Sequence, residues 1–444
     1  MSPFEIGLAS VGAIVVLIYM GVYIPIALGL VSFLAIWFLR DSFELPMALL
    51  KIAIGDSVTE YSFATIPLFT FMGLIVSRAG LGEDVYKVMN TLFHRIMGGV
   101  GMATVGANAL FAAVTGSSIA SASVFTKVAV PEMLKLNYNK RFAVGVVAGS
   151  SVLGMIIPPS AMLIIYAIVA EQSVGHMFLA GIIPGLMLAA AYIIAIFVMS
   201  KLTPNFVMNK EAVQAANEHD KGMSKLLNGS QMAVLCLPLL GLVFTVLGGI
   251  YTGWLTPVEA GAAGAALGLV IAILRRRMTL KSFWSALLET GHITAAILFL
   301  ITAASIYSRM LGIAGVPNAL ADFLETYNLG FVAVMTLLVV LMLFLGTLLD
   351  TASIILIVVP LFLPIVEPLG ISLVWFGIIV VIGAEIGLLT PPLGISCFVI
   401  KSTIDDPRVS LKDVFMGALP FAGVMLIVLL ILIEFPILST VLLP

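Results

Sequence analysis

Charged residues are scarce in this chain of 444 residues, at 10% of all positions, whereas hydrophobic residues make up 61%. A soluble domain has about a quarter of its residues charged, because its surface faces water. The mean hydropathy is +1.20, and runs such as 142–170 and 226–258 contain no charged residue at all. A membrane-spanning helix needs about 20 apolar residues. The sequence therefore predicts an all-α protein with several membrane spans and a surface that mostly faces lipid.

Other features are also missing, and each absence argues against a class of function or site. The net charge of −2 and the lack of a basic tail argue against nucleic acid as a partner. Cys236 and Cys397 stand alone in apolar surroundings, which predicts buried thiols and not a disulfide or a metal site. The sequence has no H-E-x-x-H zinc motif, no G-x-S-x-G elbow and no pair of membrane aspartates, so we do not expect an enzyme.

One polar stretch, 201–230, interrupts the apolar sequence, and it contains four lysines, three acids and His219. Two predicted spans separate it from Arg275, Arg276 and Arg277, so both basic segments fall on the same side of the membrane. The excess of Lys and Arg in cytoplasmic loops makes that side cytoplasmic. We therefore predict a first membrane repeat at 1–200, a cytoplasmic loop at 201–230 and a second membrane repeat at 231–444.

The two halves share an ordered set of Gly, Pro and polar positions. The spacing is 229 for Ser121/Asp350 and Pro131/Pro360, 234 for Phe142/Phe376 and Gly149/Gly383, and 233 for Gly154/Gly387, Pro158/Pro391 and Pro159/Pro392. Apolar segments that Gly and Pro interrupt at corresponding places are a pointer to a transporter's binding site. Each half is predicted to hold a re-entrant hairpin (about 112–135 and 345–366) and a Pro-Pro-broken helix (about 142–171 and 372–402).

The Pro-Pro pairs predict breaks inside the spans, because two successive residues lack the N–H that a helix needs. In lipid, the freed carbonyl groups of 149–157 and 383–390 must find partners. A desolvated Na⁺ is one such partner; a kink satisfied by neighbouring helices or water is the structural alternative.

Polar residues before each break extend this prediction. Ser121 fits an ion ligand or close helix packing equally well. Asp350, flanked by apolar residues, is a functional hypothesis by default, and it also fits a helix N-cap. Glu385 fits either the site or a structural role that holds a hairpin, and we favour the structural role. Arg309 fits an anion ligand, although an arginine that extends toward a helix end is commoner.

Taken together, the Gly-Ser-Ser…Pro131 hairpin, the break at 149–160, Leu349-Asp-Thr351…Pro360 and the 387–392 break resemble the large, DctM-like membrane subunit of TRAP transporters. The resemblance covers essentially the whole chain. It implies two inverted-topology repeats, a mobile transport domain that moves like an elevator, and Na⁺ as the coupling ion, with no other cofactor. It also implies uptake of an organic acid anion across the bacterial inner membrane. The implied partners are a small four-helix membrane subunit and a periplasmic substrate-binding protein.

The resemblance also implies site residues, with carbonyl groups contributing alongside hydroxyls. The Na⁺ sites would use Ser117, Ser118, Ser121, Gly149, Ser151, Val152 and Pro158 in the first half and Gly346, Asp350, Thr351, Gly383 and Thr390 in the second. Substrate would contact Ser117, Ser160, Thr347, Asp350 and Pro391. Many relatives have an acid where this chain has Ser121, which removes one carboxylate from the first half.

A stand-alone secondary carrier or antiporter fits the broken helices equally well on physical grounds, and the family motifs alone favour the multi-subunit system. A channel fits less well, because two broken hairpins imply occluded sites. The residues do not choose among dicarboxylates, sialic acid, keto acids, sulfonates and ectoine.

Overall fold

The computed structural model describes residues 2–208, 227–327, 330–392 and 394–443. Within these ranges the chain is helical, and its β pairing is a single isolated bridge between Tyr138 and Met208. Six helices of the described ranges are long and apolar enough to cross a membrane, and a bent helix pair would make a seventh. The predicted all-α polytopic membrane fold is confirmed.

The helices of the first half are α1 Pro3–Tyr19, α2 Ile24–Arg40, α3 Glu44–Thr59, η1 Tyr61–Ala64, α4 Thr65–Arg78, α5 Leu81–Phe93, α6 Gly99–Thr115, α7 Ser118–Lys135, α8 Lys140–Ser151, α9 Leu153–Ile156, α10 Ala161–Val169, α11 Val174–Leu202 and α12 Pro204–Val207. Those of the second half are α14 Gly229–Val243, η2 Phe244–Gly248, α15 Gly249–Tyr251, α16 Pro257–Leu274, α17 Leu280–Ala314, α18 Val316–Thr326, α19 Phe331–Gly346, α20 Thr351–Val366, α21 Leu373–Gly387, α22 Ile395–Thr403, α23 Leu411–Glu434 and α24 Ile437–Thr440. Of the predicted loop at 201–230, residues 209–226 lie outside the described ranges.

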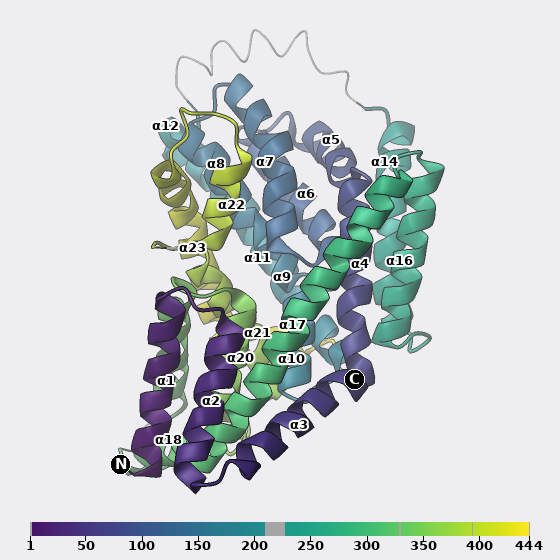
Figure 1. Cartoon of the computed structure of the whole chain (residues 1–444). Helices are drawn as coiled ribbons and strands as arrows, with labels where there is room; N and C mark the ends of the chain where they lie inside the picture. Colours follow the sequence, from purple (N-terminus) through teal and green to yellow (C-terminus); the bar gives the residue numbers. More distant parts are fainter. Residues whose placement is uncertain (1, 209–226, 328–329, 393, 444) are drawn as a thin grey trace.

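The long helix α17 crosses the whole molecule, and Figure 1 shows it running obliquely over the face turned to the viewer. Helices α2, α3 and α4 pack against it, and α16 packs against α4. On the other side of the fold, α8 packs against α23, and α11 packs against both α6 and α23. The helices α6 to α10 and α19 to α22, which contain the predicted hairpins and breaks, thus lie among these longer helices.

The arginines after α16 do more than end a span. Asp84, at the start of α5, is almost completely buried and pairs with Arg275 and with Arg277, the latter at 2.8 Å. Arg277 also donates to the backbone carbonyl of Ala79 at 3.1 Å. A buried carboxylate needs such partners, because desolvation of an unpaired charge is expensive. The cluster fixes the end of α16 to the α4–α5 corner.

The two hairpins begin earlier in the chain than predicted. In the first, α6 and α7 meet at Gly116 and Ser117, so the hairpin starts at Gly99 and not near residue 112. In the second, α19 and α20 are joined by residues 347–350, so the hairpin starts at Phe331 and not near residue 345. In each half, the apolar helix before the tip, α6 or α19, is the first arm of the hairpin. The opposite membrane orientation of the two halves stays a prediction.

Candidate cation and substrate site

Two pairs of helix starts in the two halves have the same spacing. The N-caps Ser117 and Asp350 begin α7 and α20, and Asn139 and Ser372 begin α8 and α21; each pair is 233 residues apart. Pro158 and Pro391 show the same spacing, and each forms a cis bond with the proline that follows it. The spacing therefore holds from the hairpin tips to the breaks.

This spacing corrects the predicted pairing of Ser121 with Asp350, which is wrong. Ser117 is the structural counterpart of Asp350, and Ser121 lies one turn inside α7. By the same spacing Pro131 corresponds to Pro364, not to Pro360. One cause is a longer second tip: residues 347–350 join α19 and α20, whereas two residues join α6 and α7. This insertion accounts for two of the four residues by which the sequence pairing is shifted.

In the first half, the hairpin tip touches the helix break directly. Gly116 has a positive φ of 55°, and a Cβ atom added there would lie 2.6 Å from the carbonyl oxygen of Pro159. A Cβ atom on Gly154 would lie 2.9 Å from the carbonyl carbon and oxygen of Ser117. Real Cβ atoms essentially never come within 3.0 Å of another heavy atom. Glycine at both positions therefore allows the two backbones to meet, as expected where backbone approaches backbone.

Some of the predicted hydroxyl ligands of the first half already make hydrogen bonds within the described part of the fold, and one does not. Ser117 caps α7 by accepting from the Ala120 N–H at 3.3 Å. Ser151 donates to its own helix at Ala148, and Ser160 donates to the Met155 carbonyl at 2.5 Å while it caps α10. Ser121 is fully buried, and its Oγ has no hydrogen-bond partner among the described residues. Such an unpaired buried hydroxyl has capacity left for a ligand.

In the second half, the tip meets the break in the corresponding place. A Cβ atom on Gly387 would lie 2.3 Å from the Cα of Gly346, so these two backbones are in contact. Asp350 caps α20: one carboxylate oxygen accepts from the Ser353 N–H at 3.3 Å, and the other accepts from the Ser353 hydroxyl. The N-cap geometry expected for Asp350 is therefore present. Gly154 and Gly387, both four residues before a Pro-Pro pair, each touch the tip of their own hairpin.

Glu385 enters this site from α21, and the sequence did not single it out as a ligand. Its side chain is fully buried, and one carboxylate oxygen accepts from the Thr351 hydroxyl at 2.6 Å. The other oxygen, Oε2, has no partner in the part of the chain that the structure describes. Two neighbouring hydroxyls are instead used locally, since Thr347 donates to Phe344 and Thr390 donates to Gly387, both at 2.8 Å.

Several predicted ligands lie in packing contacts. A Cβ atom on Gly149 would lie 2.4 Å from the Phe421 side chain of α23, and one on Gly383 would lie 2.3 Å from the Met342 side chain of α19. These glycines let helices approach closely, and their carbonyl groups lie in helical backbone. Pro158 and Val152 are buried at the first break, whereas Pro391 is exposed at the second. Helix α9 packs against α21, so the regions of the two breaks adjoin.

A separate polar cavity of about 830 Å³ lies between α3, α10, α17 and α20. Its lining includes Asp56, Glu60, Glu171 and Arg309, but none of the predicted Na⁺ or substrate residues. Arg309 donates to Asp56 at 3.2 Å, so it pairs with a neighbouring helix instead of extending toward a helix end. The predicted ligands lie at the hairpin tips and breaks, away from this cavity.

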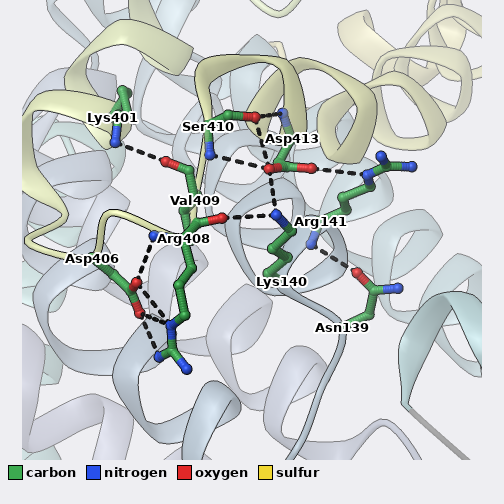
Figure 2. A network of polar contacts seen from close by, with 9 residues as sticks. All are labelled: Asn139, Lys140, Arg141, Lys401, Asp406, Arg408, Val409, Ser410 and Asp413. Carbon is green, nitrogen blue, oxygen red and sulfur yellow. Dashed lines mark hydrogen bonds and ion pairs between the residues drawn. The ribbon is translucent and has the colours of Figure 1, made fainter.

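A network of charges fixes the start of the first broken helix (Figure 2). Asp413, at the start of α23, accepts from Lys140 and Arg141 at 2.9 Å each and from the Ser410 hydroxyl at 2.7 Å. In the loop before α23, hydrogen bonds from Arg408 lower the pKa of Asp406 to about 2. Below the network, a Cβ atom on Gly145 would lie 2.1 Å from the Gly417 carbonyl oxygen. The network and this close crossing hold α8 against α23.

Comparisons with known proteins identify the class and then the family. The fold matches two solved structures of transporters: YdaH of Alcanivorax borkumensis has a TM-score of 0.59 and 14% identity, and 87% of this chain and 88% of that one are covered. MtrF of Neisseria gonorrhoeae, which represents a class of antimetabolite efflux pumps, has a TM-score of 0.61 and 12% identity. The match covers 89% of this chain and 84% of that one. At such identities the likeness concerns the fold alone, which is that of a multi-pass membrane protein.

The family follows from the sequence matches. Residues 11–438 match the DctM component of the tripartite ATP-independent periplasmic transporter. The C4-dicarboxylate TRAP transporter large permease protein DctM of Pseudomonas aeruginosa is 32% identical over 393 residues, or 88% of each chain. The sialic acid TRAP transporter large permease protein SiaM of Vibrio cholerae is 29% identical over 380 residues, or 85% of each. This chain belongs to the DctM family of TRAP transporter large permeases, as the sequence motifs predicted.

Proposed function

We propose that this chain is the large membrane subunit of a Na⁺-coupled transporter that takes up an organic acid anion across the bacterial inner membrane. In this proposal, a small four-helix subunit completes the membrane part, and a periplasmic binding protein delivers the substrate. The hairpins and broken helices move together against the remaining helices, in the manner of an elevator.

The observation that carries the proposal is the contact between hairpin tip and helix break in both halves. Gly154 meets Ser117, and Gly387 meets Gly346, so each break is held against a tip that carries hydroxyl or carboxylate oxygens. Alkali cations take hard oxygen ligands from hydroxyls, carboxylates and freed carbonyl groups. The unpartnered oxygens of Ser121 and Glu385 lie near these tips among apolar surroundings. The residues present therefore fit a small cation in each half.

The substrate class rests on chemistry and on the relatives. Helices α7, α10 and α20 begin at the tips and breaks, where their N-terminal N–H groups and positive dipole ends favour an anion. Relatives are named for C4-dicarboxylate, sialic acid, 2,3-diketo-L-gulonate and isethionate; the first three carry carboxylates and the last carries a sulfonate. A carboxylate bound beside Na⁺ would have its charge balanced by the coupling ion.

Reconstitution tests both the function and the stand-alone alternative. Liposomes that hold this chain with its membrane partner should accumulate the anion only with the binding protein present and an inward Na⁺ gradient. Liposomes that hold this chain alone, with free substrate, should show no accumulation above empty liposomes. Accumulation by the chain alone would overturn the multi-subunit proposal and favour a stand-alone carrier.

A further inference from the structure

Glu385 is a buried acid whose contacts are incomplete. It lies on α21, two residues before Gly387, and its side chain has no exposed surface. Its single hydrogen bond comes from the Thr351 hydroxyl at the first turn of α20, and its Oε2 atom has no partner among the described residues. None of the ion pairs within the described ranges involves Glu385 or Asp350.

Burial of this kind disfavours the ionised form of the carboxyl group unless a cation is bound beside it. A buried carboxylate needs an opposite charge and further hydrogen bonds to offset its desolvation. Asp350 adds to the difficulty, because it caps α20 directly before Thr351, the residue that Glu385 contacts, and so places a second acid beside it. Both oxygens of Asp350 already accept from Ser353 in the helix cap. A cation near Thr351 would relieve the repulsion and give the Oε2 atom a partner.

We propose that Glu385 is a charged positioning residue of the second cation site, acting together with Thr351. The inference rests on the proposed Na⁺ coupling and deepens it. By accepting the hydrogen bond from the Thr351 hydroxyl, Glu385 turns the lone pairs of that hydroxyl toward the cation. Its carboxylate also adds a negative charge beside the site.

The first half lacks this feature. At the spacing of 233 that relates the tips and breaks, Glu385 corresponds to Val152, and Thr351 corresponds to Ser118. Val152 is buried and apolar, so no carboxylate supports Ser118 in the same way. The two cation sites are therefore unequal, and the second one depends on a buried charge.

The test is a Na⁺ titration of thermal stability, made on the purified membrane complex without substrate, for wild type and for Glu385→Gln. A ligand at concentration c that binds only the native state stabilises it by RT ln(1 + c/Kd), so the unfolding temperature starts to rise when the Na⁺ concentration approaches the dissociation constant. We expect Glu385→Gln to raise the Na⁺ concentration at which stabilisation begins by about tenfold or more. Thr351→Val should raise it as well, and the double variant should be no worse than the stronger single variant.

Tyr192→Phe is the control for a purely structural role. The Tyr192 hydroxyl is buried near Glu385 and has no partner among the described residues, so a small shift could let it bind the carboxylate. We expect this variant to keep the wild-type Na⁺ titration. Equal destabilisation of Glu385→Gln at every Na⁺ concentration, with stabilisation beginning at the wild-type Na⁺ concentration, would overturn the inference. So would an equal shift in Tyr192→Phe.

The design separates two kinds of failure. If Na⁺ stabilises wild type no more than the same concentrations of K⁺ or choline do, the Na⁺ coupling itself is refuted. If wild type responds and both Glu385→Gln and Thr351→Val respond identically, only the role of Glu385 is refuted. Should Glu385→Gln not fold, Thr351→Val carries the decision, because it leaves the acid in place and removes the hydroxyl.

Discussion

Gly387→Ala is the smallest change that should prevent the second hairpin tip from packing against its break. We expect it to abolish transport. The added Cβ would lie 2.3 Å from Gly346 Cα and 2.7 Å from its carbonyl carbon. Ordinary contacts of a Cβ atom begin at about 3.4 Å. The obstacle is backbone at the tip of a hairpin and not a flexible side chain, so α19 or α21 must move by about an ångström.

The size of the effect follows from the packing. Overfilling a well-packed interior lowers stability by typically about 1–3 kcal/mol. Uptake should fall much further than stability, because a misplacement of about 1 Å at a site can lower a rate by about a hundredfold. We therefore expect Gly387→Ala to insert and fold, with a modest loss of thermal stability and uptake below about 1% of wild type.

Gly423→Ala provides the matched control. Gly423 is also in a helix, α23, but a Cβ atom there would meet nothing within 4 Å. Alanine in place of a helical glycine adds about 0.5–1 kcal/mol of stability where space is free. Uptake in proteoliposomes and thermal unfolding should be compared at equal protein content. Wild-type uptake by Gly387→Ala would refute the view that the tip and the break form one site.

Three further predictions concern particular contacts. Ser121→Ala should keep or slightly raise thermal stability, because the Ser121 hydroxyl has no partner among the described residues; a loss above about 1 kcal/mol would reveal a hydrogen bond that we have not identified. Asp84→Asn should lower the free energy of unfolding by about 3 kcal/mol, the lower end for breaking a buried ion pair, and a change within measurement error would contradict the role of this cluster. Asp413→Ala should lower it by about 1–2 kcal/mol through the lost capping-box bonds from Ser410 and two half-exposed ion pairs, as thermal unfolding in detergent will show.

Membrane class, family and the positions of the two breaks were predictable from the sequence. Low charge, long apolar runs and two Pro-Pro pairs are local signals, and each has a direct physical meaning in lipid. The N-cap role of Asp350 was also predictable, because an Asp before an apolar run is a common start of a helix. The Na⁺ and substrate roles of the named residues stay predictions.

The register of the halves and the place of Glu385 were not predictable from the sequence. The two extra residues of the second tip account for part of the shift in the pairing, and a single sequence contains no sign of which side of the tip carries the insertion. Glu385 reaches Thr351 across 34 residues of chain, through the packing of α20 against α21. A buried acid at a helix end is a local signal, but its partner depends on tertiary contacts. The same holds for Asp84, whose arginines are about 190 residues away in the chain.

The most direct test of Na⁺-coupled uptake is transport by the reconstituted complex with the external Na⁺ replaced by choline at fixed pH. The proposed function predicts that accumulation of the organic anion stops without Na⁺ and returns when an inward Na⁺ gradient is restored. Unchanged accumulation in choline would contradict it, and the oxygen-lined tips and breaks would then need another explanation.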